Sequence, residues 1–191
     1  MSTGPFPPIE TARLRIRCVE QKDAESTAAL MTKAVSDWLA SWPAPFTTEM
    51  ARSRVKLARN SASQRQAMPC AITLKSNGAF AGWITLTKTE SDRRRGSLGY
   101  WLGTQYHGHG FAREALNALL SVGFNFLDLD IIEAGAQPEN LGSFAVMRAC
   151  GMTEIGKRMV HATARQRDEL CVFYEINHTT FDRILRVQEI V

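Results

Sequence analysis

Three glycines and two histidines lie within residues 103–110, between an aromatic, strand-like run and a helical pattern. A strand that enters a helix through glycines leaves the first backbone N–H groups of the helix without partners. These groups and the helix dipole together form a site for an anion. Gly108 and Gly110 also carry no side chain that would keep a phosphate away from the backbone. The segment therefore predicts a phosphate or pyrophosphate site, with a tight glycine turn as the plain alternative.

Two common nucleotide loops and a metal site match this segment poorly. A P-loop needs G-x-x-x-x-G-K-[ST]; Gly103 and Gly108 have the spacing, but the Lys and the hydroxyl residue are absent. A dinucleotide loop needs a third glycine where this chain has Arg113. His107 and His109 could share one face of a strand, but no Cys, Asp or Glu stands nearby at ligand spacing, so we expect no metal.

The composition is that of one globular domain. The chain has 191 residues, of which 45% are hydrophobic and 22% charged. The net charge of +4 is small and spread along the chain, and Arg93–Arg95, its densest part, is interpreted as a solvated turn rather than a substrate-facing patch. The four cysteines form no C-x-x-C pair, which favours reduced core thiols in a cytoplasmic protein. We find neither a secretory signal nor an apolar run long enough to span a membrane.

Hydrophobic periodicity indicates the elements that must position the glycine segment. Strands are expected at residues 12–20, in a hairpin over 70–88 that turns at Asn77-Gly78, and at 97–103, 131–137, 152–160 and 169–176; helices are expected at 23–35, from Thr47, from Gly110 and at 141–150. This order predicts one α/β (α+β) domain over residues 1–191, with helices on the faces of a mixed sheet. Residues 1–8 are expected to be flexible, and residues 179–191 to form a tail that could be helical.

Two motifs resemble the signatures of the GNAT-fold acetyltransferases. QYHGHG, residues 105–110, fits Q/R-x-x-G-x-G/A, and PENLGSFAVMRACGM, residues 138–152, resembles N-x-x-S followed by a helix that ends at a glycine. With the opening IETARLRIR and the Trp-Pro loop, the chain is similar to the RimJ/RimL branch over roughly residues 8–177. The resemblance implies a GNAT fold: a mixed sheet of about seven strands with a splayed strand pair, flanked by about four helices.

The resemblance also implies the reaction: an acetyl group passes from acetyl-CoA to a primary amine, such as a protein N-terminal α-amine, by direct attack in a ternary complex. Backbone N–H groups would hold the CoA pyrophosphate, and the pantetheine amides would pair with strand backbone in the splayed gap. The implied cofactor-binding residues are Tyr100, Trp101, Leu102, Gln105, His107, Gly108, His109, Gly110, Phe111, Ala112, Asn140 and Ser143.

The catalytic roles are implied by the same resemblance. Ser143 is the candidate acid near the CoA sulfur and Asn140 a candidate ligand contact; alternatively, Asn140 caps the helix and Ser143 makes only a local hydrogen bond. The tyrosine that many relatives use as an acid corresponds to Met147, which cannot donate a proton. Their glutamate base corresponds to Ser97, so Glu133 on the neighbouring strand is the candidate substitute, unless it is an ion-paired strand residue.

The acceptor is less defined than the cofactor. An N-terminal α-amine, with a pKa near 8, needs a base less than a lysine near 10.4, so the missing glutamate favours a low-pKa amine or indicates lost activity. Trp38 and Trp42 could line the acceptor groove or cap the core. We expect a small-molecule amine or a protein N-terminus as partner, no nucleic acid and no membrane, and leave a homodimer open. A non-catalytic acyl-CoA sensor and an ATP- or NAD-dependent enzyme are the alternative functions.

Overall fold

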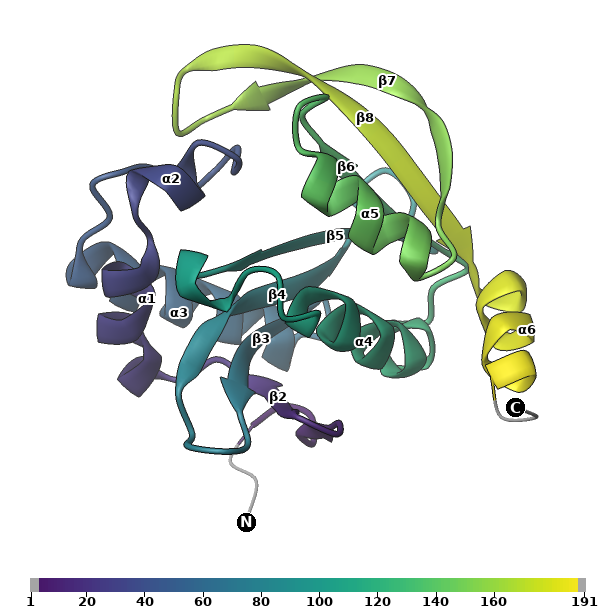
Figure 1. Ribbon diagram of the computed structural model, residues 1–191, viewed down its shortest axis with the longest axis horizontal. Helices are drawn as coiled ribbons and strands as arrows, with labels where there is room; N and C mark the ends of the chain where they lie inside the picture. Colours follow the sequence, from purple (N-terminus) through teal and green to yellow (C-terminus); the bar gives the residue numbers. More distant parts are fainter. Residues whose placement is uncertain (1–3, 189–191) are drawn as a thin grey trace.

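One eight-stranded mixed sheet forms the centre of the protein (Figure 1). The computed structural model describes residues 4–188, with side chains described through residue 184. The strands are β1 (Ile9–Glu10), β2 (Leu14–Cys18), β3 (Ala67–Leu74), β4 (Phe80–Lys88), β5 (Arg95–Leu102), β6 (Ile131–Ala136), β7 (Thr153–Ala162) and β8 (Arg167–Asn177). Their order in the sheet is β1-β2-β3-β4-β5-β6-β8-β7. Only β5 and β6 pair in parallel; the other neighbours are antiparallel.

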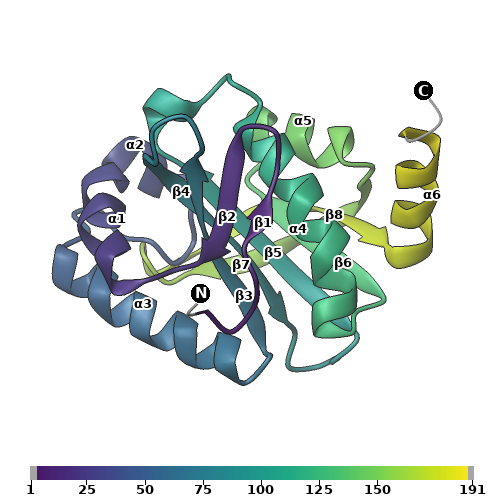
Figure 2. The same ribbon diagram turned by 90° about the horizontal axis from the view of Figure 1, so that it is seen from below.

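Helices cover both faces of this sheet (Figure 2). They are α1 (Ala24–Leu30), α2 (Lys33–Ser36), α3 (Thr48–Ser63), α4 (Phe111–Leu127), α5 (Leu141–Ala149) and α6 (His178–Gln188), with two 3-10 turns, η1 (Gln21–Asp23) and η2 (Thr104–Tyr106). Apolar side chains of α4, α5 and α6 form one core with the sheet, and those of α1 and α3 form a second core on the other face. No helix in the described part of the chain is long and apolar enough to cross a bilayer.

Local sequence signals explain several element ends. The Thr47 side chain accepts a hydrogen bond from the Met50 N–H at 3.2 Å and so begins α3 as an N-cap. The β3–β4 hairpin turns at Asn77-Gly78, where Gly78 has a φ of +73°. Gly151, with a φ of +82°, follows the end of α5 as a C′ glycine. These three ends confirm the sequence prediction.

The mixed sheet and the GNAT-type splay are also confirmed, but the element counts are wrong by a few. The sheet has eight strands rather than about seven because a two-residue strand, β1, pairs with β2. Residues 4–188 contain six helices rather than about four, since α6 forms in the tail and the helix expected at 23–35 is broken. Thr32 is extended, with φ −74° and ψ 166°, and begins a separate α2, which lets Val35 reach the same core as Met31.

The two ends of the chain were expected to be tails. Residues 1–3 and 189–191 lie outside the described residues, but Phe6 is buried and its ring packs edge-on against Phe126 at 5.5 Å. Phe181 of α6 is buried against Phe124. The described cysteines are free, as expected; three are buried and Cys171 is half-buried.

Candidate active site

The parallel pair β5–β6 separates halfway along its length. The two strands pair only over Arg95–Ser97 and Ile131–Glu133. Beyond this point β5 continues as Leu98–Leu102, paired only with β4, and β6 continues as Ala134–Ala136, paired only with β8. Each strand therefore has backbone groups on its inner edge without a strand partner. A cavity of about 1490 Å³ opens here, and both diverging segments line it.

Three further parts of the chain contribute most of the predicted residues to the cavity wall. The first is the η2–α4 junction, with Tyr106, His107, Gly108, Gly110, Phe111, Ala112 and Arg113. The second is the start of α5, with Asn140 and Ser143. The third is formed by α3 and the segment before it, with Trp38, Trp42, Phe46 and Arg54. The cavity thus brings together most of the residues that the sequence predicted; Gln105, His109 and Glu133 are not in its wall.

The η2–α4 junction, residues 103–113, has the geometry of an anion site, and we call it the cradle. Gly108 and Gly110 both have a φ of +76°, a conformation that residues with a Cβ adopt only at a cost. Gly110 is the N-cap of α4 and provides no side-chain cap, so the first N–H groups of the helix are available. A Cβ built on Gly108 would meet nothing within 4 Å. Glycine is therefore required here by backbone conformation, and open space lies beside it.

Arg13 fixes the cradle from outside. Its Nε donates to Glu114 at 2.7 Å, and its Nη1 donates to the His109 carbonyl oxygen at 2.8 Å. Its guanidinium also lies 4.7 Å from the centre of the Phe111 ring. Burial would raise the pKa of Glu114, but hydrogen bonds from Thr11 and Arg13 outweigh it and lower that pKa. Glu114 therefore carries the charge that holds Arg13 in place.

The two histidines stabilise the cradle loop. His107 Nε2 donates to the Leu102 carbonyl oxygen at 2.9 Å, which ties the loop to the end of β5. His109 Nδ1 donates to the His107 carbonyl oxygen at 2.7 Å, and its ring stacks on Phe111 at 5.5 Å. Among the described residues no group of three or more His, Cys, Asp or Glu could hold a metal ion. These bonds give both histidines a structural role, although His107 also lines the cavity.

The start of α5 presents a free hydroxyl to the cavity. The Asn140 side chain accepts a hydrogen bond from the Ser143 N–H at 3.1 Å, so Asn140 is the N-cap. The Tyr100 hydroxyl donates to the Ser143 carbonyl oxygen at 3.3 Å. Burial raises the pKa of Tyr100 to about 12, which keeps this hydroxyl protonated at neutral pH. Within residues 4–184 the Ser143 hydroxyl itself makes no hydrogen bond, so it is available to a ligand.

Glu133 lies outside this arrangement. Its carboxylate pairs with Arg95 at 3.3 Å and with Arg158, and Arg95 also pairs with Glu175 at 2.6 Å. Ser97 stands opposite Glu133 in the strand register and does line the cavity. This geometry is the ion-paired alternative considered for Glu133, and we do not assign it the role of a base.

The α3 side of the cavity is built from aromatic rings in edge-on and tilted contact. Trp42 lies at the centre, with its ring 5.1 Å from Phe46, 5.2 Å from Trp83 and 5.3 Å from Trp101. The Arg54 guanidinium covers the remaining side of Trp42 at 4.1 Å. Trp42 therefore both lines the cavity and packs against the core. We call Trp42, Phe46, Trp101 and Arg54 the aromatic chamber.

A polar clasp ties the β7–β8 turn to the segment after α2, whose Leu39 lines the cavity. Arg165 of the β7–β8 turn donates to the carbonyl oxygens of Ser36 at 3.0 Å and Leu39 at 3.1 Å. Arg165 is itself held by Glu169 at 2.5 Å. Hydrogen bonds from Arg165, Arg167 and Gln137 lower the pKa of Glu169 to about 2. Figure 1 shows the β7–β8 hairpin arching over the sheet towards α2, where this clasp forms.

Two cations of the site were missed from the sequence. Arg113 lines the cavity in the first turn of α4, where the helix dipole disfavours a positive charge. A cation in that position is itself a signal for an anion bound nearby. Arg54 gave no such signal, because nothing in the sequence indicates that it meets Trp42. The Arg93–Arg95 turn lies away from the cavity wall, and Arg94 pairs there with Asp128 and Asp130.

Comparisons with known proteins agree with this geometry. A family model described as the acetyltransferase (GNAT) domain matches residues 13–153. The uncharacterized N-acetyltransferase p20 of Bacillus licheniformis is 28% identical over 159 residues, which cover 82% of this chain and 88% of p20. Mycobacterium smegmatis RimJ in complex with CoA-disulfide has a similar structure, with a TM-score of 0.79 at 22% identity over 95% of this chain and 93% of that one.

A second solved structure comes from the other half of the branch that the motifs resemble. RimL, a ribosomal L7/L12 alpha-N-protein acetyltransferase solved with coenzyme A, has a TM-score of 0.76 at 20% identity, over 90% of this chain and 98% of that one. At such identities these two structures establish a shared fold, while the family model covers most of the chain. The splayed strands, the glycine cradle and the match over residues 13–153 lead to one assignment: the chain belongs to the GNAT acetyltransferase family.

Proposed function

We propose that this protein is an acetyl-CoA-dependent N-acetyltransferase that acts on a primary amine, with a protein N-terminal α-amine as the favoured acceptor. One observation carries the proposal: the cradle and the aromatic chamber open into the same cavity, on either side of the splayed strands. A phosphate-bearing donor and an amine could therefore meet there. RimJ and RimL, whose folds are similar, were solved with CoA species, which supports CoA chemistry in this cavity.

The residues present suit acetyl-CoA, which supplies the activated acetyl group and a thiol leaving group. The first N–H groups of α4 and the nearby Arg113 match the two charges of a pyrophosphate. The inner edges of Leu98–Leu102 and Ala134–Ala136 have unpaired backbone groups for the two pantetheine amides. The pyrophosphate and the two pantetheine amides thus each have a counterpart in the cavity wall.

The chain's own residues then hold or move protons. The Ser143 hydroxyl is the proposed proton donor to the departing sulfur, since it is free and lines the cavity. Tyr100 positions this residue through its bond to the Ser143 carbonyl oxygen. A thiol with a pKa of about 8.5 is a moderate leaving group, so the donor contributes modestly.

The missing base favours an α-amine acceptor. At pH 7 roughly a tenth of an N-terminal amine is neutral, whereas only about one lysine side chain in 2500 is neutral. Ser97 cannot take a proton from the amine, and both oxygens of Glu133 face arginines. An acceptor that is already partly neutral removes most of this demand. We also place the reaction in the cytoplasm, as four free thiols favour a reducing compartment.

The missing base also favours a second candidate function, that of a non-catalytic acyl-CoA sensor. A screen for thiol release from acetyl-CoA, with N-terminal peptides, amino acids and polyamines as acceptors, separates the two. Turnover on at least one acceptor supports the enzyme. Tight CoA binding with no turnover on any acceptor supports the sensor, and absence of CoA binding contradicts both.

A further inference from the structure

Arg54 is a cation without an anion. Its only hydrogen bond among the described residues is from Nη2 to the Ser41 carbonyl oxygen at 2.5 Å, and no carboxylate within that part of the chain forms an ion pair with it. Its neighbours are the faces of Trp42 at 4.1 Å and Phe46 at 5.8 Å. Burial lowers the pKa of Arg54, with no carboxylate to offset it. Most of its five N–H donors therefore have no protein acceptor.

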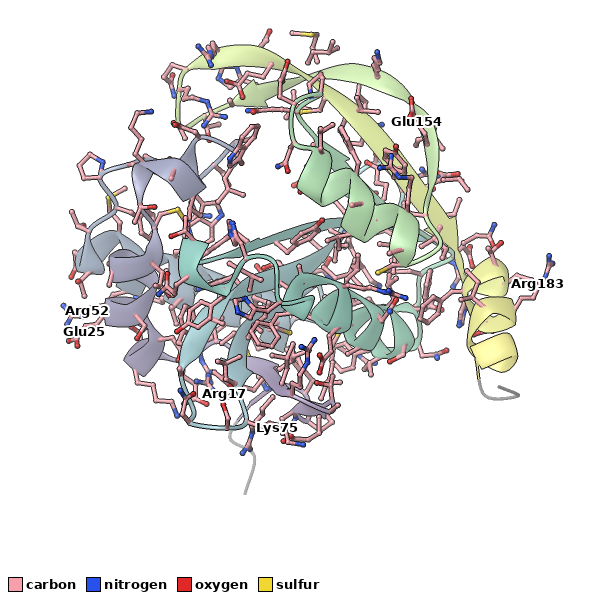
Figure 3. All side chains as sticks on the ribbon, in the orientation of Figure 1. Arg17, Glu25, Arg52, Lys75, Glu154 and Arg183 are labelled. Atoms are coloured by element: carbon pink, nitrogen blue, oxygen red, sulfur yellow. The ribbon has the colours of Figure 1, made fainter. Side chains whose placement is uncertain are left out.

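Three other arginines, in contrast, lie close to carboxylates. Arg17 pairs with Asp23 at 2.7 Å, and Arg165 with Glu169 at 2.5 Å. Arg52, two residues from Arg54 on α3, lies near Glu25 and Glu49 at 3.9 and 3.7 Å. Figure 3 shows Arg52 beside Glu25 on the outer side of α3 and α1. Packing alone would favour a neutral side chain over a partly buried, unpaired guanidinium, so the charge needs another explanation.

A second donor in the same chamber is also unsatisfied. The Trp101 indole N–H is buried and has no hydrogen-bond partner, the one such side-chain group in the described part of the chain. The Trp83 N–H, by contrast, donates to the Thr27 hydroxyl at 2.9 Å. Trp101 and Arg54 both pack on Trp42 and both line the cavity. Two donors without acceptors on one aromatic wall indicate a ligand that brings oxygen atoms.

The charge count selects the type of oxygen ligand. The charged side chains in the described cavity wall, histidines aside, are Glu49, Arg54, Arg113 and Glu139. Arg113 belongs to the cradle, and Glu49 lies near Arg52, so Arg54 is the cation left at the chamber. A single guanidinium matches a singly charged carboxylate, which it can bind through two parallel hydrogen bonds. Against a phosphate dianion, the single charge of Arg54 would neutralise only one of the two negative charges.

We infer that Arg54 determines acceptor specificity by binding a carboxylate that the acceptor amine carries. This inference rests on the proposed function, because it assigns the chamber to the acceptor. The carboxylate has two sources: an acidic side chain next to a peptide N-terminus, or the α-carboxylate of a free amino acid. Both place an anion a few bonds from the reacting amine.

Paired acceptors test the inference and separate the two sources. The first pair is two peptides that differ only at the second position, which is Asp in one and Asn in the other. The second pair is a free amino acid and its amide. We expect the wild type to prefer the carboxylate member of one pair by 10- to 100-fold in kcat/KM, and Arg54→Gln to remove that preference through KM. Arg54→Lys keeps the charge but not the planar guanidinium, so its preference for the carboxylate acceptor should lie between those of the wild type and Arg54→Gln. Arg52→Gln is the matched control and should change neither constant.

Three results would overturn the inference: equal kcat/KM within both pairs for the wild type, an equal loss on both members in Arg54→Gln, or the same shift in Arg52→Gln. Folding is checked separately by the Tm, which Arg54→Gln should lower only slightly, through loss of the Ser41 hydrogen bond and the Trp42 contact. Tryptophan fluorescence of the CoA-saturated protein gives a readout without turnover. Carboxylate ligands that quench the wild type but not Arg54→Gln support the site even if no acceptor is acetylated. No binding to the wild type contradicts it.

Discussion

The cradle and the aromatic chamber use different parts of the chain. The cradle is one continuous segment, residues 103–113, and it presents main-chain N–H groups set by two glycines with a φ of +76°. The chamber combines Trp42, Phe46, Arg54 and Trp101, which come from a loop, from α3 and from β5, and it presents side chains. Both open into one cavity.

This difference predicts how substitutions affect the cradle and the aromatic chamber. The cradle depends on backbone conformation, so most substitutions outside its glycines leave the donor groups in place. The chamber depends on side-chain identity, so one substitution changes the ligand that fits. A family with this architecture can keep its donor site and vary its acceptor site on the same fold.

The largest effect is expected at the cradle. Gly110→Glu should weaken CoA binding at least about 100-fold, or about 2.7 kcal/mol, because a carboxylate at the cradle would repel the pyrophosphate. Its side chain would also crowd Arg13, whose Nη2 lies 3.4 Å from the Cβ position. The positive φ adds strain of about 1–2 kcal/mol to the folded state. Isothermal titration with CoA measures the loss.

Gly78→Glu separates strain from binding. Gly78 has a φ of +73°, and a Cβ there meets nothing within 4 Å, but it lies in the β3–β4 turn and does not line the cavity. It should lose a similar amount of stability and keep its CoA affinity within about twofold. Unchanged CoA affinity in Gly110→Glu would show that the cradle is not the site that binds CoA.

The sequence predicted the cradle because its determinants are local. Glycines next to a helix start, the N-caps Thr47 and Asn140, and the turn at Gly78 act over two or three residues. Of the chamber the sequence indicated only Trp42, as one of two possible wall residues. Its contact with Trp101 could not be predicted, because the two residues are 59 positions apart and meet only once the sheet forms. Tertiary packing also decided the break at Thr32 in the expected helix.

In the chamber, Trp42 and Trp38 should differ in stability. Trp42→Ala removes a ring that packs on three others and should cost about 3 kcal/mol. Trp38 is 43% exposed, so Trp38→Ala should cost less than about 1 kcal/mol. Urea unfolding measures both. If both substitutions lower the free energy of unfolding equally, Trp42 is not the centre of the aromatic wall.

At the start of α5, Ser143→Ala should lower kcat about tenfold, which is about 1.4 kcal/mol of transition-state stabilisation. The Ser143 N–H still bonds to Asn140, so its Tm should match the wild type. Asn140→Ala is the contrasting variant, since it removes the N-cap and should cost about 1 kcal/mol of stability. A kcat that stays within twofold in Ser143→Ala would exclude the hydroxyl as the acid.

Glu133 shows why a carboxylate at a plausible sequence position was not enough. The sequence put it on the strand next to that of Ser97, and the register sets the two residues opposite each other. Whether its charge is free depended on Arg158 of β7 and Arg95 of β5, which no local pattern links to it. Long-range ion pairs of this kind are set by strand order, which the sequence left open.

The smallest expected effect concerns the polar clasp. The pKa of Glu169 is held at about 2, below its ordinary value of 4.5, so its ion pair stabilises the fold fully above about pH 4.5. This contribution is lost as the pH falls from 4.5 to 2, when the folded protein also takes up the proton. With about 1 kcal/mol from the pair, Glu169→Gln should lower the Tm by about 2–4 °C at pH 7.

The pH dependence of that difference is the sharper measurement. The Tm values of wild type and Glu169→Gln should converge as the pH falls towards 2, because the protonated carboxyl no longer pairs with Arg165. Glu90→Gln, which removes an exposed carboxylate that makes no ion pair among the described residues, should stay within about 1 °C of the wild type at pH 7. A Tm difference that persists at pH 2 would mean that Glu169 acts through packing. The β7–β8 turn would then be held against Ser36 and Leu39 by shape rather than by charge.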